Sequence, residues 1–461
     1  MRERALFSLK SIHGQHKVKG KVKMMRTNFA KHLGIIAALV FACTAVTVHA
    51  EDVTESLHTC TLTFDPQSVP DMEVTGVGLK GEFLFYQSNM TLHTDETGMA
   101  DGVSKYYPPS EYESGMASIG GLYYEEMTKN EDGIYDITLT LPAGVYPYQF
   151  VINPELGPED EQMSWSNVTT KDGEKKGFVD LMSSLQLGNQ APKNRFITDP
   201  LNPPTVPTVT GNQSNSELIV GTCKETLRAP IDDEAKKGTV SYQSYIDIDG
   251  KVQSAGIYLP AGYDKEKTYP LLLVSHGGGG NEGDWFSQGQ LGNIMDNLIA
   301  QGKTKEAIVV TPNNVVYDWD YEKIAANIQD CLLPYLEKIY HISSDVHDRA
   351  FCGLSMGSMT TLYMFYHYSE RYDYFGAFSG GLAPGNEYFS LDDDHIREVK
   401  LLIGSAEEDI AYNYQDIGVP TTIEALKEAE VPFEPYFVTG SHDWFCWPDM
   451  FAYFAENFLW Q

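Results

Sequence analysis

The sequence predicts an all-β domain followed by an α/β domain. From residue 58 to about residue 200, short strand-like runs are separated by turn-forming residues. From about residue 218, short apolar runs of the buried-strand type alternate with segments of helical spacing. With 461 residues, the chain is long enough for two or three domains, each with a core of its own.

The first 50 residues predict an export signal. Basic residues lead into an apolar run at residues 34–46, which is too short to span a bilayer as a permanent helix. Val48 and Ala50 place small residues where a signal peptidase reads them, so we expect cleavage after Ala50 and a secreted or periplasmic protein. The basic stretch is long for a signal and leaves the true start residue open. We therefore assign residues 1–50 to a signal peptide with an N-terminal extension.

The chain is strongly acidic, and its charge is unevenly distributed. The net charge is −31, but residues 1–50 hold nine of the 33 Lys and Arg and one of the 64 Asp and Glu. The chain after Ala50 therefore carries a net charge of −39, which repels nucleic acid and anionic membranes. We expect neither as a partner once the signal is cleaved. The sequence does not indicate an oligomeric state.

Residues 51–204 have the pattern of a β-sandwich. Residues 74–86 have strand composition, and residues 134–141 alternate in polarity before the turn residues Pro142-Ala143-Gly144. Residues 145–152 are then expected to return as the second strand of a hairpin. Short strands with turns between them are typical of an immunoglobulin-like sandwich.

Residues 205–217 have the composition of a linker, and we assign residues 218–461 to the α/β domain. Its expected strands are apolar runs at residues 271–274, 307–310, 401–403 and 435–438. Helical spacing occurs at residues 291–301 and 327–340. This alternation predicts a mostly parallel sheet with helices on both faces.

The most informative motif is Gly353-Leu354-Ser355-Met356-Gly357, which follows an apolar run. It has the G-x-S-x-G form of a nucleophile elbow. Glycines two residues on either side of Ser355 permit a tight, strained turn from strand to helix, which exposes the hydroxyl at the apex. The motif makes Ser355 the candidate nucleophile.

A glycine-rich loop, Ser275-His276-Gly277-Gly278-Gly279-Gly280, follows an expected strand. A tetrahedral intermediate needs two N–H donors, and glycines after a strand let the backbone direct its amides toward one point. The candidate oxyanion-hole donors are therefore the amides of Gly277 or Gly278 and of Met356. A phosphate-binding loop is the alternative, but Asn281-Glu282 stands where that loop requires Lys-Ser/Thr.

His442 lies near the C-terminus in Gly440-Ser441-His442-Asp443-Trp444, after an expected strand. A late histidine fits the order nucleophile, acid, histidine of hydrolases that carry such an elbow. The acid should then lie between Ser355 and His442, at the end of a strand. Three carboxylates stand at such a place, and the residues alone leave the choice open: Glu407, Glu408 and Asp409.

Residues 240–461 resemble carbohydrate esterase family 1, the esterase D-like α/β-hydrolases that include feruloyl esterases and acetylxylan esterases. The segments that carry the resemblance are residues 257–263, 269–285, 349–357 and 440–447. They hold the glycine loop, the elbow and the histidine loop in the family's order. The resemblance implies an α/β-hydrolase fold.

The resemblance also selects the acid. The family's acid falls in a segment of the form G-x-G-x-x-D, and aligning Gly404 with its first glycine places Asp409 on the acid. Two residues depart from the family's pattern. Ala406 replaces the second glycine of this segment, and Ser358 replaces the glycine that usually follows the elbow.

The implied chemistry is that of a serine carboxylic-ester hydrolase. Ser355 attacks the ester carbonyl, His442 takes its proton, and Asp409 holds His442. This mechanism needs no metal and no organic cofactor. The spacing of the five cysteines after the signal matches no zinc site, and their disulfide pairing stays open.

The β domain resembles the early-set immunoglobulin-like modules of carbohydrate-active enzymes, including family 48 carbohydrate-binding modules. The matching segments are residues 133–135, 142–150 and 198–204. The resemblance implies either a module that binds sugar or one that only packs on the catalytic unit and shapes its cleft.

Feruloylated arabinoxylan is the preferred substrate class, from which the enzyme would release ferulic or another hydroxycinnamic acid. Export, the acidic surface and the module-like β domain suit feruloylated or acetylated xylan and xylo-oligosaccharides. Three tryptophans near the expected active-site loops are candidate substrate-binding residues: Trp285, Trp319 and Trp444.

Three alternatives remain. An acetylxylan esterase is the nearest, because the residues do not distinguish a feruloyl from an acetyl group. A siderophore esterase would cleave anionic catecholate trilactones, which a net charge of −39 disfavours. A non-catalytic carbohydrate-binding protein is disfavoured because serine, histidine and a candidate acid are all present.

Overall fold

The computed structural model describes residues 57–81, 85–87, 93–94, 100–101, 116–118, 124–153, 165–169, 175–179, 195–203, 215–406, 409, 418–438 and 442–460. The predicted signal peptide and its cleavage site lie outside these residues, and so do Glu407, Glu408 and most of the predicted linker. Within the described ranges, no helix combines the length and the apolar character that crossing a bilayer requires.

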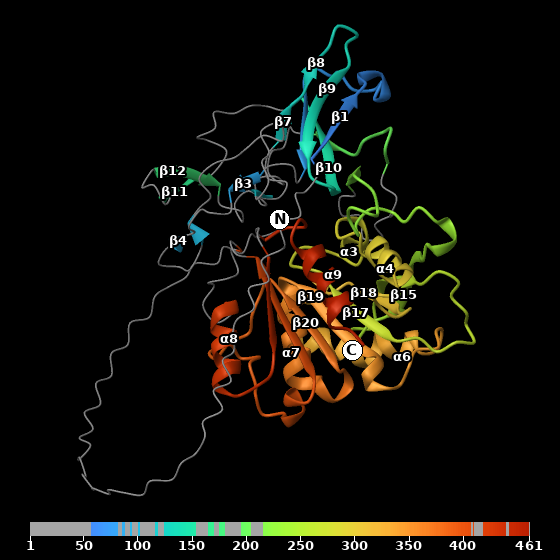
Figure 1. The fold of residues 1–461 in the computed structure, drawn as a ribbon, viewed down its shortest axis with the longest axis vertical. Helices are drawn as coiled ribbons and strands as arrows, with labels where there is room; N and C mark the ends of the chain where they lie inside the picture. Colours follow the sequence, from blue (N-terminus) through green and yellow to red (C-terminus); the bar gives the residue numbers. More distant parts are fainter. Residues whose placement is uncertain are drawn as a thin grey trace, which may run out of the picture. The chain divides into compact units, whose positions relative to one another are not determined.

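The N-terminal region consists of strands, as predicted (Figure 1). They are β1 (His58–Phe64), β2 (Val77–Gly81), β3 (Phe85–Gln87), β4 (His93–Thr94), β5 (Ala100–Asp101), β6 (Met116–Ser118), β7 (Tyr124–Glu126), β8 (Thr128–Lys129), β9 (Tyr135–Leu141), β10 (Gly144–Ile152), β11 (Trp165–Thr169), β12 (Lys175–Val179), β13 (Arg195–Ile197) and β14 (Ser216–Val220). One sheet has the order β1-β9-β8, and the other has the order β13-β10-β2-β7, with β14 also paired to β10. The remaining strands form the pairs β3-β6, β4-β5 and β11-β12.

The two larger sheets share one hydrophobic core, which confirms the predicted sandwich. Phe64 of β1 and Phe150 of β10 meet edge to face across it, with ring centroids 5.0 Å apart. Leu139 of β9 and Leu79 of β2 are buried in the same core. The resemblance of this region to carbohydrate-binding modules stays a prediction.

The predicted hairpin of residues 134–152 is wrong, because its two strands belong to different sheets. β9 pairs with β1, whereas β10 pairs with β2, β13 and β14. All nine residues of β10 are buried, so this strand needs partners and packing on every side, while β9 alternates between buried and more exposed residues. The short connection at Pro142 and Ala143 therefore carries the chain from one sheet to the other.

The predicted domain boundary at residue 218 also needs correction. The strand β14 pairs with β10 along its whole length, from Gly144↔Val220 to Tyr148↔Ser216. Ser216 is fully buried, and its Oγ accepts a hydrogen bond from the amide of Asp199 at 2.8 Å. The β domain therefore extends to Val220. Composition alone assigned Ser216 to a linker, because it cannot reveal a partner 17 residues away.

The α/β region is built on one eight-stranded sheet of order β15-β16-β18-β17-β19-β20-β21-β22. Its strands are β15 (Thr239–Ile246), β16 (Val252–Leu259), β17 (Leu271–Ser275), β18 (Ile308–Pro312), β19 (Arg349–Leu354), β20 (Tyr374–Phe378), β21 (Lys400–Ala406) and β22 (Glu434–Val438). The pairs β15-β16 and β16-β18 are antiparallel, and all other neighbours are parallel. The prediction of a mostly parallel sheet is confirmed.

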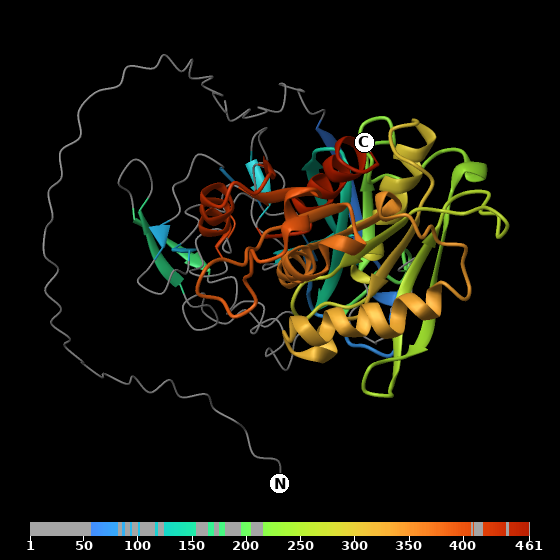
Figure 2. The same cartoon turned by 90° about the horizontal axis from the view of Figure 1, so that it is seen from below.

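Helices cover both faces of this sheet, as the alternation predicts (Figure 1 and Figure 2). They are α3 (Asp284–Ser287), α4 (Leu291–Ala300), α5 (Tyr321–Asn327), α6 (Leu333–Leu336), α7 (Met356–Tyr368), α8 (Val419–Glu428) and α9 (Trp447–Asn457). Short 3-10 turns occur at Pro66–Ser68, Glu234–Lys236, Val315–Tyr317, Val346–Asp348, Ser369–Arg371 and Asp394–Arg397. One core holds residues of α5, α6, α7 and α8, and the other holds residues of α3, α4 and α9.

The central strand β17 contributes side chains to both cores. Leu271 and Leu273 lie in one core, and Leu272 and Val274 lie in the other. Successive side chains of a strand point to opposite faces, so a strand buried on both faces has a continuous apolar run.

The helix expected at residues 327–340 begins earlier, at Tyr321. Asp320 caps it, because its side chain accepts a hydrogen bond from the amide of Lys323 at 2.9 Å. The helix continues through a π-helical turn at Ile328–Leu332 into α6, which carries Pro334 in its first turn. The prediction rested on the spacing of apolar residues, which does not reveal a polar capping residue such as Asp320.

Candidate active site

Ser355 stands at the junction of β19 and α7 in a strained backbone conformation, with φ 53° and ψ −117°. Its amide donates a hydrogen bond to the carbonyl oxygen of Phe378 at 2.8 Å. A Cβ on Gly353 would lie 2.6 Å from the Gly357 oxygen, and a Cβ on Gly357 would lie 2.4 Å from the Ser275 oxygen. Only glycine fits at these two positions, so the motif forms the tight turn that its spacing predicts.

The structure brings Ser355, His442 and Asp409 into one hydrogen-bonded chain. His442 Nε2 lies 3.0 Å from Ser355 Oγ, and His442 Nδ1 lies 2.8 Å from Asp409 Oδ1. Asp409 follows β21 and is 2% exposed, and His442 follows β22. The three residues thus come from the carboxyl ends of β19, β21 and β22, in the order that the sequence predicts.

His442 is the titratable residue in the middle of this hydrogen-bonded triad. Its burial lowers the pKa of the imidazole, but the carboxylate of Asp409, as a charge and as a hydrogen-bond acceptor, raises it, and Asp443 raises it further. The net shift is upward from the ordinary value, so the two carboxylates stabilise the charged imidazole more than burial disfavours it. A histidine that can hold a proton between a hydroxyl and a carboxylate suits general acid–base catalysis.

Two residues that sequence reasoning did not single out lie beside His442. The ring of Trp447 meets the imidazole edge to face, with centroids 5.0 Å apart, and its Nε1 donates to Ser379 Oγ at 2.9 Å. Asp443 accepts hydrogen bonds from the amides of Phe445 and Cys446 at 3.0 and 3.2 Å, just before α9. Burial raises the pKa of Asp443 to about 7. The signal was present in the sequence, because both residues stand within five positions of His442.

The candidate oxyanion loop lies directly against the elbow. A Cβ on Gly277 would lie 2.7 Å from Leu354 Cδ1 and 3.3 Å from Ser355 Cβ, so the backbone of Gly277 is a neighbour of Ser355. Met356 is the first residue of α7, a 13-residue helix whose N-terminal amides and dipole favour negative charge. The second candidate donor, Gly278, lies against the indole of Trp319, 2.7 Å from the place of a Cβ.

His276 holds this loop and stays neutral. The amide of Asn314 donates to its Nε2 at 2.9 Å, so Nδ1 carries the proton and donates to the oxygen of Gly277 at 2.7 Å. Burial lowers the pKa of His276 to about 4. This histidine therefore joins the glycine loop to the loop after β18, and neither of these hydrogen bonds goes to a carboxylate that would stabilise a charged ring.

The structure corrects two of the three tryptophan predictions. Trp285 is fully buried, donates from Nε1 to the oxygen of Ser275 at 2.9 Å, and packs against Phe451, so it belongs to the core. Trp444 is 9% exposed and lies between Trp285 and Trp447. Both were expected near substrate because they follow the active-site motifs closely in sequence, but the helix α3 and the turn before α9 direct them into the core. Trp319 is 45% exposed beside the glycine loop.

The two departures from the family's pattern have local structural roles. The hydroxyl of Ser358 donates to the oxygen of Gly380 at 2.7 Å and ties α7 to the loop after β20. Ala406 is the buried last residue of β21, and its oxygen accepts a hydrogen bond from the amide of Asp409 at 3.4 Å. Neither departure disturbs the contact of Asp409 with His442.

The cysteines and the remaining ligand-type side chains form no second centre in the described part of the chain. The five cysteines expected after the signal are free thiols, and Cys352 is buried in β19. No cluster of three or more His, Cys, Asp and Glu side chains is placed there to hold a metal ion.

Residues 250–409 match the family model described as Esterase. The chain carries a carboxylic-esterase domain. The match begins at the turn before β16 and ends at Asp409, so it includes the glycine loop, the elbow and the acid. His442 lies beyond the matched segment, and its place in the esterase domain rests on the geometry above.

The chain is similar to several known proteins. A protein of Xylanibacter ruminicola named endo-1,4-beta-xylanase/feruloyl esterase is 34% identical over 212 residues, which cover 43% of this chain and 28% of that protein. The chain thus spans less than a third of that relative's length. The structure of a CE1 ferulic acid esterase from Anaeromyces mucronatus in complex with ferulic acid is 25% identical, covers 52% of this chain and 97% of its own, and has a TM-score of 0.45. An enterobactin esterase from Shigella flexneri is 14% identical, covers 86% of this chain and 92% of its own, and has a TM-score of 0.49.

Proposed function

We propose that the protein is a serine carboxylic-ester hydrolase that releases ferulic acid, or a related hydroxycinnamic acid, from feruloylated arabinoxylan. The observation that carries the proposal is the contact of His442 with Ser355 Oγ at 3.0 Å on one side and with Asp409 at 2.8 Å on the other. This arrangement can activate a serine hydroxyl near neutral pH, and it lies at an esterase domain's elbow.

The proposed reaction has two halves. Ser355 Oγ attacks the ester carbonyl while His442 Nε2 takes its proton, and Asp409 stabilises the resulting imidazolium. The amides of Met356 and of Gly277 or Gly278 donate to the oxyanion. The alcohol leaves with the proton from His442, and water, deprotonated by His442, then hydrolyses the acyl-enzyme and frees Ser355.

Three observations support the feruloyl substrate. The related segment belongs to a protein named as a xylanase and a feruloyl esterase. The net charge of −39 after residue 50 suits a neutral polysaccharide better than the anionic catecholates of siderophores. The exposed Trp319 beside the glycine loop offers an aromatic surface to the polysaccharide part of such an ester. Acetylxylan remains the second candidate substrate, because acetyl and feruloyl esters need the same catalytic groups.

We further propose that residues 1–50 direct export and are removed after Ala50. A polysaccharide of the plant cell wall is too large to enter a cell, so an enzyme that acts on it must reach the outside. N-terminal sequencing of the protein from the medium or periplasm tests this step, and a chain that keeps residues 1–50 would contradict it.

The proposal is tested by comparing hydrolysis of feruloylated arabinoxylan, acetylxylan and a catecholate trilactone by the purified protein. We expect the highest kcat/KM on the feruloylated polymer and no activity above background in Ser355→Ala. Preference for the trilactone would overturn the substrate. Full hydrolysis of methyl ferulate and p-nitrophenyl acetate by Ser355→Ala would overturn the nucleophile.

A further inference from the structure

We propose that Trp319, with its neighbours Asp318 and Asp320, forms the subsite for the neutral sugar ring on the alcohol side of the ester. The inference rests on the proposed function and adds a specificity-determining residue to it. It starts from the position of Trp319, whose indole edge lies against Gly278 in the candidate oxyanion loop. A group that touches Trp319 therefore lies close to the ester carbonyl held at that loop.

The exposure of Trp319 favours a sugar over an aromatic acyl group. A feruloyl ring is largely apolar and gains most from a pocket that removes it fully from water. A sugar ring has one apolar C–H face and a rim of hydroxyls that remain hydrated. An indole that is 45% exposed can cover the first and leave the second in water.

The flanking charges select a neutral polyol. Asp318 and Asp320 are exposed on either side of Trp319, and Glu322 is exposed one turn further along. Carboxylates accept hydrogen bonds from hydroxyl groups but repel anions. The chain here thus combines an aromatic surface with acceptors for hydroxyls, and it disfavours uronic acids and free ferulate.

The loop that carries Trp319 is held in an unfavourable backbone conformation. Asp318 and Trp319 have φ of 49° and 66°, a region that residues with a Cβ rarely adopt. Two such residues in succession are unfavourable, so the surrounding contacts must fix them. Strain of this kind is typical of segments that present a side chain for function.

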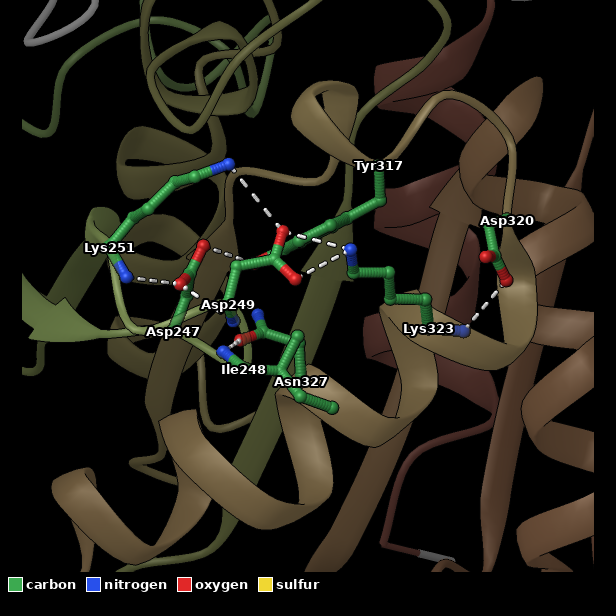
Figure 3. A network of polar contacts seen from close by, with 8 residues as sticks. All are labelled: Asp247, Ile248, Asp249, Lys251, Tyr317, Asp320, Lys323 and Asn327. Atoms are coloured by element: carbon green, nitrogen blue, oxygen red, sulfur yellow. Dashed lines mark hydrogen bonds and ion pairs between the residues drawn. The ribbon is translucent and has the colours of Figure 1, made fainter.

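A polar network, drawn in Figure 3, joins the loop that carries Trp319 to the turn between β15 and β16. The hydroxyl of Tyr317 donates to Asp247 at 3.0 Å, and Asp247 in turn accepts the amides of Asp249 and Lys251 in the turn between β15 and β16. Lys323 forms an ion pair with Asp249 at 2.7 Å. These contacts flank Trp319 on both sides along the chain, so the turn between β15 and β16 holds the segment that carries Trp319.

A second set of contacts ties the start of the same loop to the catalytic end of the sheet. Asn313 donates to the buried carboxylate of Glu282 at 2.8 Å, and Asn314 donates from its amide to His276 and from its side chain to Ser275. The loop is therefore positioned relative to the glycine loop itself, which a subsite next to the reacting carbonyl requires.

The test compares two esters with the same acyl group: methyl ferulate, which has no sugar, and a feruloylated arabinoxylo-oligosaccharide. For Trp319→Ala we expect kcat/KM on the oligosaccharide ester to fall about tenfold, mainly through KM, and kcat/KM on methyl ferulate to stay within about twofold. Trp319→Phe should restore most of the loss, because it retains an aromatic face. Asp318→Asn should lose less, about threefold.

Val316→Ala is the matched control, because Val316 is 54% exposed in the same loop and carries no aromatic face. It should change neither ester, and thermal unfolding checks that each variant is folded. Equal losses of Trp319→Ala on both esters would place Trp319 on the acyl side and overturn the inference, and so would no loss on either. If the parent hydrolyses neither ester, the proposed function itself fails.

Discussion

Two loops at the carboxyl end of the sheet each carry a histidine, buried at His276 and with a 14% exposed side chain at His442, and the two histidines have opposite electrostatics. His276, after β17, contacts two backbone groups, and burial lowers its pKa to about 4. His442, after β22, contacts Ser355 and Asp409, and its pKa is raised despite burial. Burial therefore does not decide what a histidine does in this site. The hydrogen-bond partner decides it. A histidine held by backbone groups stays neutral and fixes the loops that it connects, whereas a histidine paired with a carboxylate can accept a proton and carry charge.

The largest loss of activity is expected from substitutions at His442, the histidine of this pair that can carry charge, and at its partner Asp409. His442→Ala removes the base, so kcat on methyl ferulate should fall on the order of 10⁵-fold. Asp409→Asn should cost about 10⁴-fold, because the amide no longer stabilises the imidazolium and permits the wrong tautomer. Steady-state kinetics on the folded variants measures both. Losses below about tenfold would mean that these residues do not act with Ser355.

His276, the neutral histidine of the pair, should affect activity only because it holds the glycine loop in position. His276→Gln keeps an acceptor for the Asn314 amide but loses the donor to Gly277, so the oxyanion loop loosens and kcat should fall about tenfold, well short of one lost oxyanion donor. The variant should also resist acid better. Because His276 in the fold has a pKa of about 4 against 6.5 unfolded, its protonation on unfolding removes about 3 kcal/mol as pH falls from 6.5 through 4.

Urea unfolding of parent and His276→Gln at pH 7 and pH 4.5 measures that second effect. The parent should lose more of its free energy of unfolding than the variant over this interval. An equal loss would show that His276 is charged in the folded protein and that the contrast between the two loops is wrong.

The pH profile sharpens the same contrast. His442 must be neutral to accept the proton of Ser355, and its pKa is raised, so kcat/KM should decline with falling pH along a limb whose midpoint lies above 6.5. Asp443→Asn removes one of the carboxylates that raise this pKa, while an amide oxygen can still accept hydrogen bonds from the amides of Phe445 and Cys446. The limb should then move to lower pH. A limb that stays in place would exclude Asp443 from the electrostatics of the base.

The smallest effect is expected at a contact that touches neither histidine. Ser358→Ala removes the hydrogen bond to the Gly380 oxygen and should lower the free energy of unfolding by about 1 kcal/mol. Activity should stay within about twofold, since the G-x-S-x-G turn is intact. Thermal unfolding and kinetics on methyl ferulate measure the two, and a loss of activity beyond tenfold would mean that Ser358 helps to position Ser355.

The proposed catalytic residues could be selected from the sequence because their patterns are local. The glycines around Ser355 are required by atoms within a few residues or on the adjacent strand, and the order of Ser355, Asp409 and His442 follows from the sheet. The role of His276 was not predictable, because its partner Asn314 stands 38 residues away. For the same reason spacing could not show that Trp285 points into the core or that β9 and β10 part into different sheets.

The most direct test of the account is the rate at which a fluorophosphonate labels the protein, with the modified peptide identified by mass spectrometry. This reagent reports an activated serine without regard to the ester that the enzyme prefers. We predict that Ser355 is labelled in the parent, that His442→Ala slows labelling by at least about 10³-fold, and that His276→Gln slows it by no more than about tenfold. Labelling of another serine, or equal rates in the parent and His442→Ala, would contradict the account.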